Sequence, residues 1–114
     1  MRVKVVEYQT DVSNPYGKKA GQRLDSILVK TCVGAKKSSL SWAPWSLETK
    51  DAASFPASDE SYDTWPTPVY PFDGNRTFTP GECVKGWIEF YVTKGTKPVR
   101  VVYASDSGTH RWAL

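Results

Sequence analysis

Apolar and polar residues alternate along most of this chain, in short runs separated by turn residues. The clearest run is Cys83 to Val92, where Ile88, Phe90 and Val92 share one face. A period of two is typical of half-buried strands, and several such strands at close spacing predict an all-β sandwich or barrel. In the first run the phase shifts after Val5, which predicts a bulge. Further strands are predicted at 3–8, 23–33, 45–49, 98–103 and 110–114.

Residues 50–82 interrupt this alternation. They contain five of the eight prolines and six aromatic residues, Phe55, Tyr62, Trp65, Tyr70, Phe72 and Phe78. Such a composition is too aromatic for a disordered linker. We therefore expect a long ordered connection, with one or two short edge strands, packed over the sandwich. Long connections in compact domains are often functional.

The two cysteines lie out of phase with the apolar positions of their strands. Cys32 shares a face with Lys30, and Cys83 shares a face with Lys85. A disulfide between them would lie on the outer face of one sheet. Cys32 ends its strand and Cys83 begins its own, so the two can pair directly if these strands are antiparallel neighbours. Such a bond would indicate an oxidising compartment. Two buried thiols in a cytosolic domain are the alternative, whereas zinc would lack ligands because His110 is the only histidine.

Length and charge narrow the choice of function. A chain of 114 residues is expected to form one domain, 1–114. The net charge is +3, but the paired lysines, 18–19 and 36–37, lie in separate predicted turns, so we expect no nucleic-acid binding. No apolar run approaches the roughly 20 residues that span a bilayer. No signal or lipid anchor is visible, and an exported form would have lost its signal.

One segment resembles a known family. Phe78–Val92, followed by Pro98–Tyr103, is similar to the signature Leu-x-Pro-Gly-x-x-x-x-Gly-x-x-x-Phe-x-Val of immunoglobulin-like domains of unknown function. These domains occur on lipoproteins and secreted proteins of Gram-positive bacteria, especially actinobacteria, and are similar in fold to a mycobacterial secreted immunogenic antigen. The residues that carry the match are Pro80, Gly81, Gly86 and Phe90.

The resemblance implies an exported, immunoglobulin-like antiparallel β-sandwich of about seven strands with a long Pro/aromatic-rich connection. It supplies no catalytic residues. The chain departs from the family in the proline-aromatic insert before Phe78 and in lacking a lipobox.

Candidate catalytic and metal-binding groups are few. His110 stands beside Trp112 in the last predicted strand, where a packing or rim position is favoured over a catalytic triad. Glu82 and Glu89 are expected to face solvent. The sequence therefore predicts no enzyme, no cofactor and no metal site. The acidic residues that could bind calcium, but are expected to form a solvated loop, are Asp59, Glu60 and Asp63.

Aromatic residues are the best candidates for binding. Trp87 and Tyr91 share the outer face of their strand, and Trp65, Tyr62 and Tyr70 belong to the connection. Together they could form a platform for sugars or extended peptides, because rings combine apolar area with a polar group. The alternative is that the connection folds over this face and is anchored there by Trp87 and Tyr91.

Two functions follow from these observations. The first is a non-enzymatic exported or cell-surface module that binds a protein or a cell-envelope component. The alternative is a carbohydrate-binding module that uses the surface aromatics.

Overall fold

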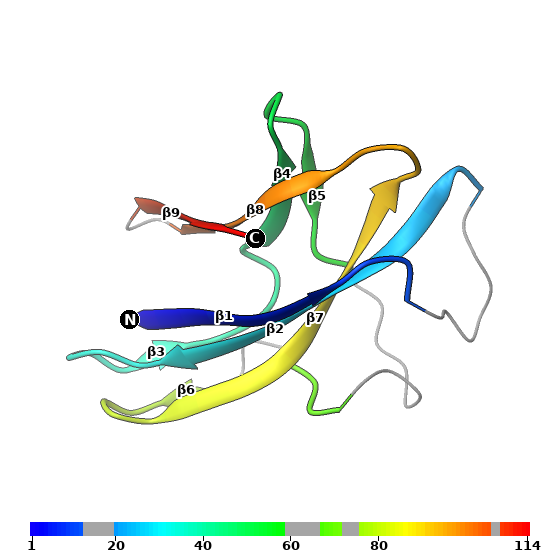
Figure 1. Ribbon diagram of the computed structural model, residues 1–114. Coiled ribbons are helices and arrows are strands. Elements are labelled where there is room, and N and C mark those ends of the chain that lie inside the picture. The colour runs from blue at the N-terminus through cyan, green and yellow to red at the C-terminus, as the bar shows by residue number, and fades with distance from the viewer. Residues whose placement is uncertain (13–19, 59–66, 72–75, 106–107) are drawn as a thin grey trace.

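The protein is built from β-strands, as a computed structural model of the chain shows (Figure 1). The structure describes residues 1–12, 20–58, 67–71, 76–105 and 108–114. Within these ranges the strands are β1 (Arg2–Gln9), β2 (Gln22–Cys32), β3 (Ser38–Ser39), β4 (Trp45–Thr49), β5 (Ser54–Pro56), β6 (Thr77–Phe78), β7 (Cys83–Thr93), β8 (Pro98–Ser105) and β9 (Gly108–Ala113). The same ranges contain no helix that is long and apolar enough to cross a membrane.

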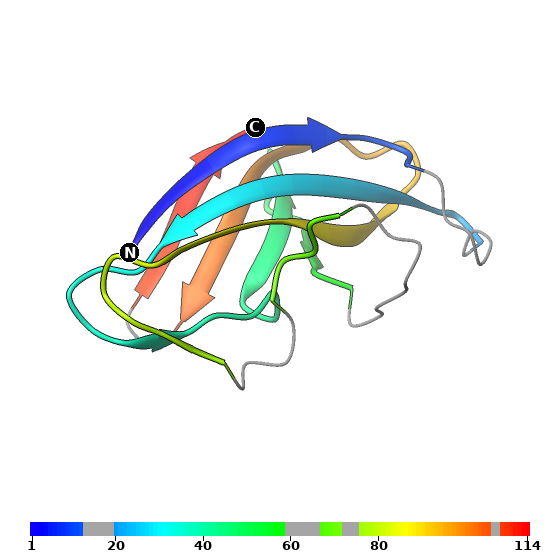
Figure 2. The same ribbon diagram turned by 90° about the horizontal axis from the view of Figure 1, so that it is seen from below.

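Two antiparallel sheets form the layers of a sandwich (Figures 1 and 2). One has the order β1-β2-β7 and the other β5-β4-β8-β9, while β3 and β6 form a small pair at the end where β1 begins. The all-β prediction is confirmed. The predicted bulge in β1 is also confirmed, because the register with β2 shifts between Val5 and Glu7.

The core lies between the inner faces of the two sheets. On β2 the inward positions are Ile27, Val29 and Thr31, all 0 % exposed, which follows from the period-two alternation of the strand. Trp45 at the start of β4 is also fully buried. The residues that make up the core cluster are Ile27, Val29, Val33, Leu40, Trp42, Trp45, Leu47, Tyr70, Phe78, Ile88, Phe90, Val92 and Val101.

The connection runs along the edge of β7 that β2 leaves unpaired. The Tyr70 N–H donates to the carbonyl of Trp87 over 3.1 Å, and the Trp87 N–H donates to the carbonyl of Pro68 over 2.9 Å. Close packing follows at Gly86, where a Cβ atom would lie 2.3 Å from the backbone nitrogen of Tyr70. A glycine is therefore needed in mid-strand because another stretch of backbone occupies the side-chain position.

Replacing Gly86 with alanine should lower the free energy of unfolding by about 2 kcal/mol, because the backbone at Val69 and Tyr70 must move away from β7. Urea unfolding measures this loss. Gly95→Ala is the control, because it adds the same methyl group where no atom lies within 4 Å and carries only the strain of a φ of +83°. An equal effect in the two variants would contradict the close approach at Gly86.

Candidate functional site

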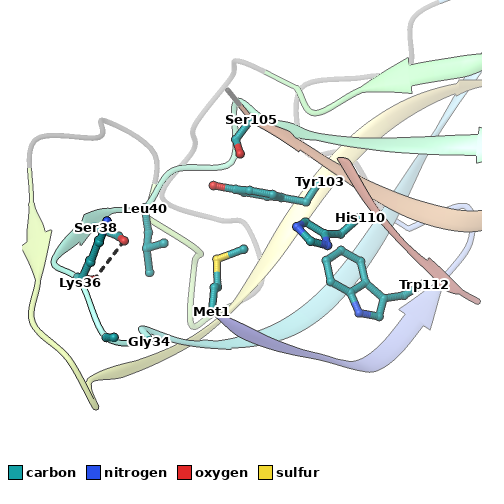
Figure 3. A pocket seen from close by; sticks show the side chains of 10 residues that line it. Met1, Gly34, Lys36, Ser38, Leu40, Tyr103, Ser105, His110 and Trp112 are labelled. Atoms are coloured by element: carbon teal, nitrogen blue, oxygen red, sulfur yellow. Dashed lines mark hydrogen bonds between the residues drawn. The ribbon is translucent and has the colours of Figure 1, made fainter. Parts of the chain in front are cut away.

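A pocket opens at one end of the sandwich (Figure 3). Met1, which precedes β1, and the segment after β2 form one side, and the β8–β9 hairpin forms the other. Its volume is about 470 Å³, within the range of small-molecule sites. The residues that line it are Met1, Gly34, Ala35, Lys36, Ser38, Leu40, Tyr103, Ser105, His110 and Trp112.

Aromatic side chains from the β8–β9 hairpin form one wall. Tyr103 and His110 are directly opposite each other across the two strands, and Trp112 follows two residues later on the same face. The imidazole of His110 stacks on the Trp112 indole, with ring centroids 6.2 Å apart. Figure 3 shows these three rings together on one side of the pocket.

The buried Trp45 packs against the core side of this wall. Its indole stacks on Trp112 with centroids 5.7 Å apart and meets the Tyr103 ring edge-on at 5.2 Å. It also meets Tyr70 edge-on at 6.0 Å. The pocket wall is therefore the outer end of an aromatic cluster that begins in the core, which restricts the motion of Trp112 and Tyr103.

Polar groups surround the entrance. Lys36 and His110 are solvent-exposed, and the hydroxyl of Ser38 donates to the carbonyl of Lys36 over 3.4 Å. Burial raises the pKa of Tyr103, so its hydroxyl is protonated at neutral pH and can donate a hydrogen bond. Among the described residues that line the pocket, none carries a carboxylate. This arrangement can stack against a ring, donate hydrogen bonds and meet a negative charge at Lys36.

The predicted aromatic platform is not assembled as expected. Tyr70 is 0 % exposed, and its hydroxyl donates to Thr31 Oγ1 over 3.0 Å inside the core, so it cannot form part of a surface platform. Burial raises its pKa to about 12. Trp87 and Tyr91 are half-buried on the outer face of β7. Trp65 and Tyr62 lie outside the described residues.

The expectation that Glu89 faces solvent is wrong. Glu89 is 2 % exposed and accepts a hydrogen bond from the hydroxyl of Ser26, which is directly opposite on β2. The pKa of Glu89 is raised to about 7, chiefly by burial and to a smaller extent by the nearby Asp25 carboxylate, while the Ser26 hydrogen bond opposes the rise. Glu82 is only partly buried, and hydrogen bonds from the Thr79 N–H and hydroxyl lower its pKa.

A sequence signal for this burial existed. Leu24 and Leu28 flank Ser26 on the outer face of β2, and both are buried. Apolar residues on both faces of a strand indicate that both faces are covered. Around Ser26 and Glu89, side chains on the outer face of the sheet therefore pack against one another and exclude solvent.

The cysteines pair as their phase predicted. Cys32 and Cys83 form a disulfide between directly opposed positions of β2 and β7, with the Cα atoms 4.0 Å apart. The bond lies on the outer face of the three-stranded sheet, together with Lys30 and Lys85.

Metal binding finds no support in the described ranges, where no group of three or more His, Cys, Asp or Glu residues is placed to hold an ion. The acidic residues weighed for calcium, Asp59, Glu60 and Asp63, lie outside those ranges.

The pocket was missed in the sequence for a definite reason. The shared face of His110 and Trp112 follows from their spacing, but the segment opposite them, from Gly34 to Leu40, is about 70 residues away in the chain. Only the tertiary fold brings the two together.

Comparison with known proteins identifies a similar fold. A secreted protein from Mycobacterium tuberculosis, MPT63, superimposes with a TM-score of 0.71 over 98 % of this chain and 81 % of that one, at 16 % sequence identity. No protein-family model and no curated protein sequence matches the chain. The immunoglobulin-like β-sandwich is thus confirmed, together with the likeness to a mycobacterial secreted protein. The resemblance to the lipoprotein family stays a prediction.

Proposed function

We propose that this protein is an exported, non-enzymatic binding module that receives part of a cell-envelope component in the pocket at the end of the sandwich. The part that enters is a ring-bearing polar group, such as a sugar unit. The observation that carries the proposal is the wall formed by Tyr103, His110 and Trp112 and supported from the core by Trp45.

The chemistry of the pocket favours binding over catalysis. An aromatic wall provides apolar area for the face of a sugar ring, while the hydroxyl of Tyr103 and the imidazole of His110 provide hydrogen bonds. General acid–base catalysis by His110 would need a group that orients it, and the described residues of the pocket lining supply no carboxylate for this role.

Export is supported by two observations. The Cys32–Cys83 disulfide is of the kind that persists in oxidising compartments. The protein of similar fold is described as secreted.

The alternative is a glycan platform at Trp87 and Tyr91, on the outer face of β7. Both side chains are partly accessible there. They lie on a different sheet from Trp112, so the two sites can be told apart in one experiment.

The proposal predicts that binding perturbs Trp112 and leaves Trp87 unchanged. Uniformly ¹⁵N-labelled protein would be titrated with chitotetraose, a soluble muropeptide and a mannan oligosaccharide, while the indole N–H signals are followed by NMR. Trp112→Phe and Trp87→Phe assign the two signals. His110→Ala should weaken the binding about tenfold, the effect of losing one good hydrogen bond and stacking partner.

Thr109→Ala is the matched control, because Thr109 belongs to the same strand and faces away from the pocket. It should leave the affinity unchanged. A shift of the Trp87 signal without one at Trp112 would favour the platform instead. No response to any of the three probes would count against sugar units as the ligand.

A further inference from the structure

Four positive side chains gather on the outer face of the three-stranded sheet. Lys4 on β1 is directly opposite Lys30 on β2, and Lys30 is directly opposite Lys85 on β7. The three lysines therefore form a row across all three strands, which we name the lysine row. Arg2 stands two residues before Lys4 on the same face, opposite Cys32.

The disulfide determines that Lys30 and Lys85 are opposed. Lys30 lies two residues before Cys32, and Lys85 lies two residues after Cys83. When two cysteines are directly opposed in an antiparallel pair, the residues two positions away along each strand are also opposed. The covalent bond therefore holds Lys30 and Lys85 side by side.

Such a row is unfavourable for the isolated protein. Directly opposed side chains in a sheet have Cβ atoms about 5 Å apart, and like charges at that separation are destabilising. All four cations are exposed, and within the described residues none of them forms an ion pair. The repulsion at Lys30 is greatest because it has a lysine on each side.

A hollow in the surface lies among these charges. A shallow groove of about 230 Å³ is lined by Arg2, Val3, Lys4, Lys30 and Cys32. An anionic group in this groove would have positive side chains on more than one side. The spacing of the row, set by strands about 4.8 Å apart, suits a ligand with several regularly spaced charges.

We propose that the lysine row and Arg2 form a docking surface for a linear acidic polysaccharide. Its carboxylate groups would cross the three strands and pair with Lys4, Lys30 and Lys85. The interaction would relieve the repulsion among the lysines, so the same side chains that destabilise the free protein would favour the complex.

The observations favour a glycan over a nucleic acid. Reading of a nucleic-acid duplex uses an element that enters a groove, whereas this surface is the face of a sheet. Binding of single strands uses exposed aromatic rings for base stacking, and none of the described residues that line the groove carries a ring. The surface requires only charge at a regular spacing, which an acidic polysaccharide supplies.

The test measures the binding of fluorescein-labelled polygalacturonate by fluorescence anisotropy, with neutral dextran as the uncharged probe. The variant Lys4→Gln/Lys30→Gln/Lys85→Gln should bind at least tenfold more weakly at about 50 mM salt. Its affinity should also depend less on salt, with the slope of log K against log salt reduced by up to about one for each lysine removed.

The control variant is Lys50→Gln/Lys94→Gln/Lys97→Gln, which removes the same charge from exposed turns elsewhere. It should bind within about twofold of the wild-type protein. The lysine-row variant should also unfold at a urea concentration no lower than the wild-type protein, which excludes misfolding as the cause of lost binding.

Three outcomes would overturn the proposal. Equal losses in the two triple variants would show that only the net charge matters. Absence of polygalacturonate binding by the wild-type protein would remove the surface as a glycan site. Tighter binding of single-stranded DNA or of phosphatidylglycerol vesicles through the same three lysines would assign the surface to another class of partner. None of these results depends on the pocket at the β8–β9 hairpin.

Discussion

Replacing Cys32 and Cys83 with alanine is expected to lower the free energy of unfolding by about 4 kcal/mol. The two residues are separated by 51 positions, and the disulfide prevents the unfolded chain from exploring conformations in which they lie apart. The entropy of closing a loop of that length corresponds to about 4 kcal/mol at 25 °C. Domains typically have a free energy of unfolding of about 5–15 kcal/mol, so this loss would remove a large part of the stability. Urea unfolding without reductant, compared with the wild-type protein, measures the loss.

Two measurements distinguish an effect of the disulfide on the unfolded chain from damage to the folded protein. If the disulfide acts on the unfolded chain, the variant should expose more surface on unfolding and show a steeper dependence on urea. Reductant should destabilise the wild-type protein by a similar amount and leave the double variant unchanged. A loss below about 1 kcal/mol would contradict the expected constraint on the unfolded state.

Alternation in the sequence predicted strands and a sandwich or barrel, and the family resemblance favoured the sandwich. The side chains of β2 and β7 divide into two faces by parity, and the pairing of Cys32 with Cys83 agrees with these strands being antiparallel neighbours. Parity is a local property, and a disulfide between directly opposed residues adds one long-range contact. Together they specify the register of a strand pair.

Two members of the lysine row, Lys30 and Lys85, could have been paired from the same facts. With Cys32 opposite Cys83, the register places Lys30 opposite Lys85 without further information. The paired lysines at 18–19 and 36–37 are adjacent in the sequence, whereas the row is formed by residues far apart in the chain. Cationic surfaces on sheets have to be sought across strands, because neighbours in a sheet are distant in sequence.

The pocket and the backbone pairing along the edge of β7 do not follow from such reasoning. The pocket depends on how the segment from Gly34 to Leu40 approaches the hairpin, which no periodicity reports. The connection reaches β7 through backbone hydrogen bonds, such as that from the Ser58 N–H to the Glu89 carbonyl over 2.8 Å. Backbone pairing has little dependence on residue type, so the sequence contains few signs of where it occurs.

Glu89 shows how such covering changes the chemistry of a side chain. Its parity places it on the outer face, where a carboxylate is normally hydrated and charged. Leu24 and Leu28 on the neighbouring strand, with Trp87 and Tyr91 on its own, instead surround it with large side chains. The second carboxylate oxygen of Glu89 has no hydrogen-bond partner within the described part of the chain. A buried carboxylate with an unpaired oxygen is more stable when protonated.

The protein is therefore expected to lose stability between about pH 4.5 and pH 7. The pKa of Glu89 is about 7 in the folded protein, against an ordinary value of 4.5 that applies to the unfolded chain. Across that interval the folded state holds a proton that the unfolded state has released, so raising the pH favours unfolding. The stabilisation is complete below pH 4.5 and is lost once the pH exceeds 7. The difference between the two pKa values corresponds to about 3 kcal/mol.

Glu89→Gln tests this directly, because the amide is neutral at every pH and can keep the hydrogen bond with Ser26. The variant and the wild-type protein should have the same free energy of unfolding at pH 4.5. At pH 8 the free energy of unfolding of the variant should be higher by about 3 kcal/mol. Taking the difference between the two proteins removes the contribution of other groups, such as Glu48, whose pKa is lowered by its hydrogen bond with Arg100. Glu7→Gln is the control, because Glu7 is an exposed residue of β1. The free energy of unfolding of this variant should change with pH in the same way as that of the wild-type protein. Parallel curves for Glu89→Gln as well would mean that the carboxylate is hydrated and charged in the folded protein, and that the covering of β7 opens to water.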